Sequence, residues 1–175
     1  MASPRYPVGP FVPPAVLAAD DRERLITVLE AAPGGLRAAV AGLSDAQLGT
    51  PYREGGWTLR EVAHHLPDSH LNSYIRFKWA LTEAAPTIKP YFEERWAELP
   101  DTRETPVAVS LELLTALHQR WIVLLRALTE ADFARRFVHP ENSAQTLAES
   151  LAYYAWHGEH HTAQIVRLRE QRGWI

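Results

Sequence analysis

The segment 146–168, TLAESLAYYAWHGEHHTAQIVRL, decides the fold that this sequence predicts. Its apolar positions recur at alternating intervals of four and three residues, which is the spacing of a helix packed in a bundle. Thr146 followed by Glu149 forms a capping-box pattern at the expected start, and Gly173 follows the expected end. The apolar line includes a histidine and consists of Leu147, Leu151, Tyr154, Gly158, His161, Ile165 and Leu168.

Three earlier segments have the same helical period, and two of them open on a similar capping pattern. The first opens at Asp20, with Glu23 three residues on, and stops at Gly42; the second opens at Thr58 and is closed by Pro86; the third runs from near Ser110 to Leu128. Together the four segments predict an all-α four-helix bundle with a long connection between helices 2 and 3.

That connection, residues 86–106, contains four prolines, and its part 92–99 could form a short helix. No strand pattern stands out anywhere in the chain. The segments 43–48 and 128–133 resemble each other, and each precedes a Thr-Leu-x-Glu helix start. A duplicated helix pair is therefore one interpretation, and chance similarity of short segments is the other.

Composition indicates one globular domain over residues 1–175, with 1–18 as an extended N-terminal segment. The net charge of −3 argues against nucleic acid as a ligand. The absence of cysteine excludes disulfides, thiolate ligands and a cysteine nucleophile. The N-terminus has no secretory signal, and apolar runs such as 121–125 are too short to span a bilayer. We therefore expect a soluble, cytoplasmic protein that does not bind membranes.

The histidines carry the functional signal. His157 and His161 are four residues apart, so both imidazoles lie on one side of a helix. His64 and His65 are neighbours on the second helix and cannot both point inward; His65, beside Leu66, is the better inward candidate. Three histidines from two helices match a catalytic metal centre with an open position. A polar patch, or core histidines bonded to carbonyls, would also explain the pattern.

Other polar residues have two interpretations each. Asp68, one turn from His65, either orients an imidazole or a metal-bound water, or is a surface or capping carboxylate. Glu159 is expected to be solvated. The basic residues Arg53, Arg76 and Lys78 could bind an anionic substrate, although solvated helix faces are the expected interpretation. The remaining histidines are expected to be ordinary polar or hydrogen-bonded residues: His70, His118 and His139.

The chain resembles the DinB/YfiT superfamily, and specifically its YfiT branch of metal-dependent hydrolases, nearly from end to end. The resemblance rests on several motifs in order, which are more specific together than any one alone. They are Tyr6-Pro7-Val8-Gly9, Pro51-Tyr52-Arg53, Gly55-Gly56-Trp57-Thr58, His64-His65-Leu66, Asp68-Ser69-His70, 72–78, 80–83, Pro90-Tyr91, His139-Pro140, Trp156-His157, His160-His161 and Gly173-Trp174.

The resemblance implies a four-helix bundle, often dimeric, with a three-histidine metal site. Carried over by position, the ligands are His65, His157 and His161. One departure is Pro67, two residues after His65, which removes a helical hydrogen bond and is expected to kink the helix at the site.

Three functions remain open at this point. The first is a metal-dependent hydrolase that acts on a small molecule through a water at the open position. The second is a metal-dependent S-transferase that conjugates a low-molecular-weight thiol, such as bacillithiol, to electrophiles. The third is a non-catalytic metal-binding homodimer. Zinc is the expected metal and nickel a competitor, because imidazole suits both. A homodimer is expected for the enzymes too.

Overall fold

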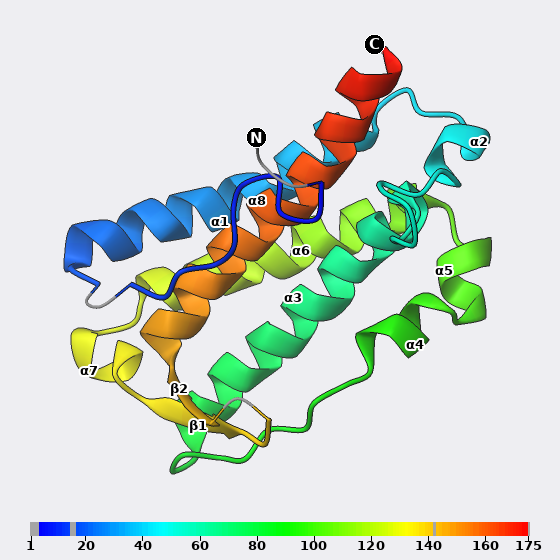
Figure 1. Cartoon of the computed structure of the whole chain (residues 1–175). Coiled ribbons are helices and arrows are strands. Elements are labelled where there is room, and N and C mark those ends of the chain that lie inside the picture. The colour runs from blue at the N-terminus through cyan, green and yellow to red at the C-terminus, as the bar shows by residue number, and fades with distance from the viewer. Residues whose placement is uncertain (1–3, 15–16, 142, 175) are drawn as a thin grey trace.

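The structure, a computed structural model, describes residues 4–14, 17–141 and 143–174. Four long helices form a four-helix bundle, as predicted (Figure 1). They are α1 (Ala19–Val40), α3 (Leu59–Thr82), α6 (Val107–Arg126) and α8 (Leu147–Arg172). Helices α1 and α3 each pack against both α6 and α8. Of the N-terminal segment 1–18, the described residues contain no helix or strand, and residues 1–3 and 15–16 lie outside the described part.

Short elements connect the long helices. They are α2 (Asp45–Leu48), α4 (Glu93–Ala97), α5 (Pro100–Glu104), α7 (Glu130–Phe133), β1 (Arg136–His139) and β2 (Ser143–Thr146). Helix α4 lies inside the predicted short helix 92–99. The antiparallel hairpin of β1 and β2 corrects the expectation that the chain has no strands. Each strand has only four residues, and Phe137 of β1 is the only fully buried residue of the two strands, so no alternating apolar pattern marks them.

The helix starts follow the predicted capping chemistry in two cases and differ in the other two. The hydroxyls of Thr58 and Thr146 accept hydrogen bonds from backbone N–H groups three residues on, at 3.2 and 3.1 Å. Helix α1 begins at Ala19, where the Ala18 N–H donates to Asp21 at 3.1 Å instead of a cap involving Asp20 and Glu23. Helix α6 begins at Val107 instead of near Ser110, with Pro106 at its N-cap and no side-chain cap.

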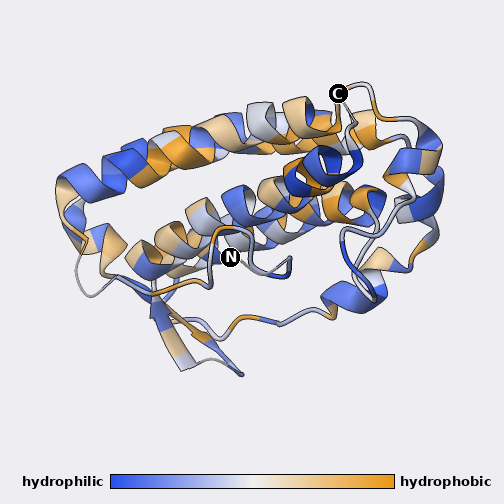
Figure 2. Cartoon of the chain, turned by 45° about the horizontal axis from the view of Figure 1, so that its top comes forward, coloured by the Kyte–Doolittle hydropathy of each residue, from blue (hydrophilic) through white to orange (hydrophobic). Residues whose placement is uncertain are grey.

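The core consists of two apolar clusters with a polar layer between them. One cluster lies toward the hairpin and centres on Trp121, Phe77 and Leu151. The other centres on Leu66 and on apolar residues near the C-terminal end of α8. Figure 2 shows hydrophobic and hydrophilic stretches alternating along the long helices, as expected for amphipathic helices. On α8 the part between the clusters contains the predicted histidine pair, which places it inside the bundle.

By length and composition alone, helix α6 could cross a membrane, although the apolar runs within it are short. The core helix of a soluble protein meets the same two criteria. Here α6 packs against α1 and α3, and its buried residues include Trp121 and Leu114. This burial accounts for part of its apolar composition, whereas Val109, Leu113 and Val123 of the same helix are exposed.

Candidate metal centre

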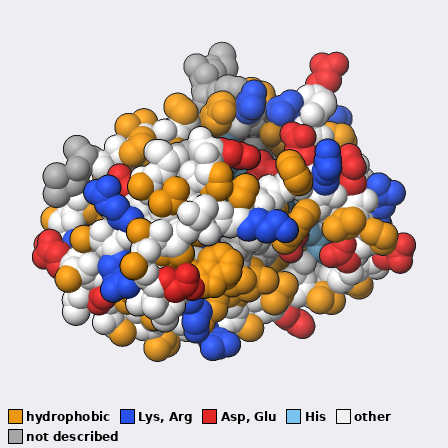
Figure 3. All heavy atoms as spheres, turned by 90° about the horizontal axis from the view of Figure 1, so that it is seen from below, with side chains coloured by type: hydrophobic (Ala, Val, Ile, Leu, Met, Phe, Trp, Pro, Cys, Tyr) orange, Lys and Arg blue, Asp and Glu red, His pale blue; other side chains and the backbone are white. Residues whose placement is uncertain are grey.

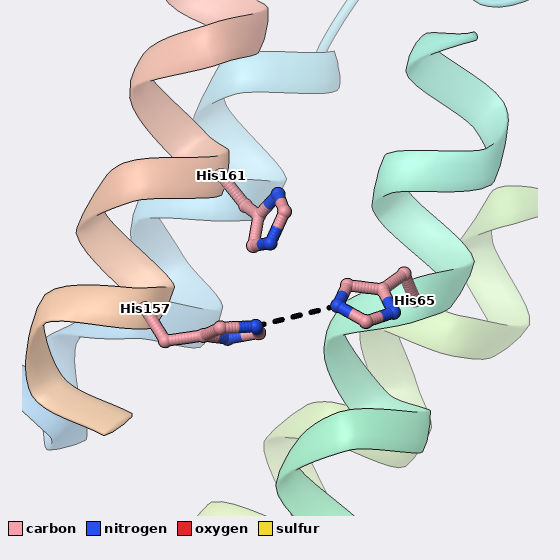
Figure 4. Close-up of side chains that lie close together, drawn as sticks. All are labelled: His65, His157 and His161. Carbon is pink, nitrogen blue, oxygen red and sulfur yellow. Dashed lines mark hydrogen bonds between the residues drawn. The ribbon is translucent and has the colours of Figure 1, made fainter. Parts of the chain in front are cut away.

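The structure brings together the three histidines that the sequence singled out. His65 comes from α3, and His157 and His161 come from α8, with their rings directed toward one another (Figure 4). Each offers one ring nitrogen, and these nitrogens all lie within 4.8 Å of one another. The Nε2 atoms of His65 and His157 are 3.3 Å apart. His64 turns away, and its Nδ1 is 2.7 Å from the Ser110 hydroxyl of α6.

The surroundings of this cluster keep its imidazoles neutral. Burial lowers the pKa of His65 to about 3 and the pKa of both His157 and His161 well below the ordinary value. The neighbouring imidazoles lower the pKa of His157 and His161 further. At neutral pH each ring therefore carries one N–H and one free lone pair, which is the form that binds metal ions.

A chain of hydrogen bonds determines which nitrogen of His157 keeps the lone pair. The Leu29 carbonyl of α1 can only accept, so His118 of α6 donates from Nδ1, at 2.7 Å. Its Nε2 then accepts from Nδ1 of His70, at 2.8 Å. Nε2 of His70 in turn accepts from Nδ1 of His157, at 3.3 Å. The Nε2 of His157, which faces His65, is therefore left without a proton.

The chain of hydrogen bonds begins at the Leu29 carbonyl, which the α1 helix itself leaves free. In a regular helix the Leu29 carbonyl would accept from the N–H of residue 33. Residue 33 is proline, which has no N–H, and it lies inside α1 in a buried position. Pro33 thus leaves the Leu29 carbonyl available to His118.

A second, shorter chain orients His161. Its Nδ1 donates to the side-chain oxygen of Gln164 at 2.9 Å, and the Gln164 amide donates to Nε2 of His160 at 3.0 Å. The Nε2 of His161 is therefore also unprotonated, and His160 lies outside the cluster. Sequence reasoning missed Gln164, His70 and His118 as partners of the cluster. The available signal was the position of His118 on the apolar line of α6, between Leu114 and Trp121.

The donor set fits a divalent metal ion. Zinc binds imidazole nitrogens at about 2.0–2.1 Å with tetrahedral geometry, so two such nitrogens lie about 3.3 Å apart. This agrees with the spacing between His65 and His157. The Trp57 ring lies over the cluster, with its centroid 4.6 Å from the centroid of the His65 ring and 6.2 Å from that of the His161 ring. The three nitrogens could therefore hold a metal ion in a partly water-shielded position.

The two carboxylates considered from the sequence lie outside the cluster. Asp68 is half-buried, and burial together with Asp101 raises its pKa to about 6. Its side chain forms no hydrogen bond to a histidine in the described part of the chain. Glu159 is exposed, as expected. Neither residue belongs to the three-nitrogen group.

Pro67 does not interrupt the helix that carries His65. Helix α3 continues from Leu59 to Thr82 with Pro67 buried inside it. The expected disturbance of the site does not prevent His65 from reaching His157. The missing hydrogen bond affects the Ala63 carbonyl, two residues before His65.

A cavity of about 940 Å³ extends from the cluster toward the hairpin. Among the three clustered histidines, only His157 lines it, and its floor also includes Ser69, Tyr154 and Arg76. Arg76 is only 9% exposed, which corrects the expectation of a solvated helix face. Lys78 is exposed as expected, and Arg53 is half-buried. Seen from below in Figure 3, hydrophobic, basic and acidic side chains are interspersed on the molecular surface.

The four-helix bundle and the inward-facing histidine cluster define a class of protein. The model of the DinB superfamily matches residues 28–165. The chain belongs to this superfamily.

Individual relatives match over nearly the whole chain. A protein of Geobacillus thermodenitrificans is 50% identical over 172 residues, covering 97% of this chain and 96% of its own. One of Bacillus mycoides is 51% identical over 170 residues, covering 97% and 98%. Both carry the name "putative metal-dependent hydrolase".

Two solved structures are similar as well. YfiT from Bacillus subtilis, described as a probable metal-dependent hydrolase with an unusual four-helix bundle topology, has a TM-score of 0.96 and 47% identity. The match covers 98% of this chain and 99% of YfiT. TT2238, described as a four-helix bundle protein, has a TM-score of 0.55 and 20% identity, covering 87% of this chain and 98% of its own. This second match concerns the fold alone.

Proposed function

We propose that this protein is a metal-dependent hydrolase whose divalent ion, zinc in the first place, is held by His65, His157 and His161. The observation that carries the proposal is the convergence of three neutral imidazoles from two helices beside a large cavity. Two of the three have their Nε2 lone pairs fixed by hydrogen bonds at the opposite nitrogen. The names of the relatives agree with this function.

The protein's own residues prepare the site for binding and reaction. A bound divalent ion supplies Lewis acidity, which polarises a substrate oxygen and lowers the pKa of water or of a thiol. His70 and Gln164 hold two of the imidazoles in one tautomer and orientation. Trp57 covers the cluster, and the cavity beside His157 provides room for a small molecule.

The test uses the full-length chain, stripped of metal and reloaded with zinc. Cleavage of 4-nitrophenyl acetate and of a 4-nitroanilide is measured with and without cysteine, and conjugation of cysteine to monochlorobimane is measured in parallel. We expect zinc-dependent cleavage without thiol. His161→Ala should lower zinc affinity more than about 100-fold and abolish turnover. The matched control Glu159→Ala, an exposed position on the same helix, should retain both.

Each other outcome selects a different function. Turnover only when thiol is present would indicate S-transfer in place of hydrolysis. The sulfur would then come from the added thiol, because the chain has no cysteine. Stoichiometric zinc binding without either activity would favour the non-catalytic metal-binding dimer. Undiminished zinc binding by His161→Ala would refute the ligand assignment.

A further inference from the structure

Arg76 is a buried cation without a counter-ion. It is 9% exposed and lies in the wall of the 940 Å³ cavity. Across the described residues, 4–14, 17–141 and 143–174, its guanidinium has neither a hydrogen bond nor an ion pair. Burying an unpaired charge is costly, and such groups are usually paired. The guanidinium of Arg76 is therefore available to an anionic group of a molecule bound in the cavity.

The carboxylates near the cavity do not neutralise Arg76. Glu149 accepts hydrogen bonds from the backbone N–H and the hydroxyl of Thr146, at 2.7 and 2.9 Å, and so caps α8. Glu93, Glu94 and Glu141 are exposed. The acidic groups and the exposed Arg95 therefore belong to the rim of the cavity, whereas the buried Arg76 belongs to its floor.

The cavity connects Arg76 to the histidine cluster along two helices. On α3, Arg76 lies eleven residues after His65, which is three helical turns on the same face and about 16 Å along the axis. On α8 the lining continues from His157 through Tyr153 to Ser150, over about 10 Å. One small molecule could therefore contact Arg76 with one end and reach the cluster with the other.

The walls between these two ends are aromatic. Phe11, Tyr91, Phe137 and Tyr153 all line the cavity. The Tyr91 hydroxyl is buried near Ser69 without a well-formed hydrogen bond, so a polar group of a ligand could bind to it. The combination of a buried cation, aromatic walls and a hydroxyl without a well-formed hydrogen bond matches an amphipathic anion.

We propose that Arg76 binds the anionic group, a carboxylate or a phosphate monoester, of an elongated small-molecule substrate whose reacting bond lies at the histidine cluster. This substrate class rests on the proposed function. The planar guanidinium matches both kinds of oxyanion through paired N–H donors. A neutral molecule of the same shape would leave Arg76 unpaired and bind less well.

The experiment measures binding, so it does not depend on turnover. Zinc-loaded full-length protein is titrated calorimetrically with 4-phenylbutyrate, with phenyl phosphate and with the neutral 4-phenylbutyramide. We expect at least one anion to bind at least 10-fold more tightly than the amide. Arg76→Gln should remove that preference, Arg76→Lys should retain part of it, and Lys78→Gln, an exposed cation on the same helix, should leave it unchanged.

Two controls separate this role from other effects. Zinc stoichiometry must be equal in all variants, which excludes anion binding to the ion as the cause of the difference. The melting temperature of Arg76→Gln should equal or exceed that of the wild type, because the variant removes an uncompensated buried charge. Equal affinity of Arg76→Gln and wild type for both anions, or absence of an anion preference in the wild type, would overturn the proposal. Anion binding without any turnover would refute the hydrolase function while leaving the Arg76 site intact.

Discussion

At the scale of single residues, His118 influences the histidine cluster although it lies outside it. It touches none of the three clustered nitrogens, yet its bond to the Leu29 carbonyl sets the proton positions in His70 and His157. Burial lowers the pKa of His118 to about 4, so the ring is neutral at physiological pH and can accept a hydrogen bond from His70.

Replacing His118 tests whether this chain prepares His157 for metal binding. His118→Leu removes the acceptor for His70, so the His157 tautomer is no longer fixed, and zinc affinity should fall about 10- to 100-fold. His118→Gln keeps a side-chain oxygen as acceptor and should lose less. Competition with a chromophoric chelator measures the affinity. Nitrogen chemical shifts of His157 in the metal-free protein report the tautomer directly, and an unchanged shift in His118→Leu would contradict the prediction.

The sequence predicted which histidines meet, but not how they are oriented. The four-residue spacing of His157 and His161 fixes their common face on any helix, and the apolar neighbours of His65 point it inward. The orientation of His157 depends on residues from α6 and α1, so it depends on how the helices pack. The burial of Arg76 was not predicted either, because a charged residue on a helix is normally solvated.

At the scale of elements, the chain repeats one arrangement. Helices α1, α2 and α3 correspond in order to α6, α7 and α8, and the short helices α2 and α7 both begin with capping boxes. The Leu59 N–H donates to the Thr50 carbonyl at 3.1 Å, and the Leu147 N–H donates to the Arg135 carbonyl at 2.9 Å. This agreement favours duplication over chance similarity. The sequence could not reveal the hairpin in the second half, whose four-residue strands are too short for a periodic signal.

Two prolines inside helices provide a matched test. Each lacks the N–H that its helix would use, at Pro33 in α1 and Pro67 in α3. Pro67→Ala restores a helical hydrogen bond and should gain about 1 kcal/mol in the free energy of unfolding after the lost restriction of the unfolded chain is deducted. Pro33→Ala should gain less, because its new N–H displaces the buried His118 N–H from the Leu29 carbonyl. Only Pro33→Ala provides an N–H that competes with His118 for the Leu29 carbonyl. It should therefore weaken zinc binding several-fold, whereas Pro67→Ala should not.

Urea unfolding and zinc competition on the same preparations provide the two measurements. The comparison between the variants distinguishes an effect on the hydrogen bonds from Leu29 to His157 from a general effect of restoring the helix. Wild-type zinc affinity in Pro33→Ala would show that the free carbonyl has no role in preparing the cluster.

At the scale of the whole molecule, the buried histidines make stability depend on pH. The pKa of His118 is about 4 in the folded protein and ordinarily about 6.5, so its contribution is complete above pH 6.5 and is lost as the pH falls toward 4. That contribution is about 3 kcal/mol in full and about 2 kcal/mol of it is lost by pH 5. Asp68 acts in the opposite direction, because its raised pKa of about 6 gives stability that is lost as the pH rises.

Several imidazoles with depressed pKa outweigh Asp68 and Glu93, whose pKa burial also raises. Metal-free protein should therefore unfold at a lower urea concentration at pH 5 than at pH 7.5. The variant His118→Gln should show a pH dependence smaller by about 2 kcal/mol, since it lacks one titrating group. Equal or greater stability of the wild type at pH 5 would mean that the histidines are solvated in the folded protein.

The hydrogen-bonded path from Leu29 through His118 and His70 to His157 passes through α1, α6, α3 and α8 in turn. Binding of the ion with full affinity would therefore indicate that every long helix is docked. A truncated or mispacked chain could keep all three coordinating side chains and still release its ion. Metal content would then serve as a quality check on recombinant preparations, and a search of genomes for three spaced histidines alone would overestimate the number of competent proteins.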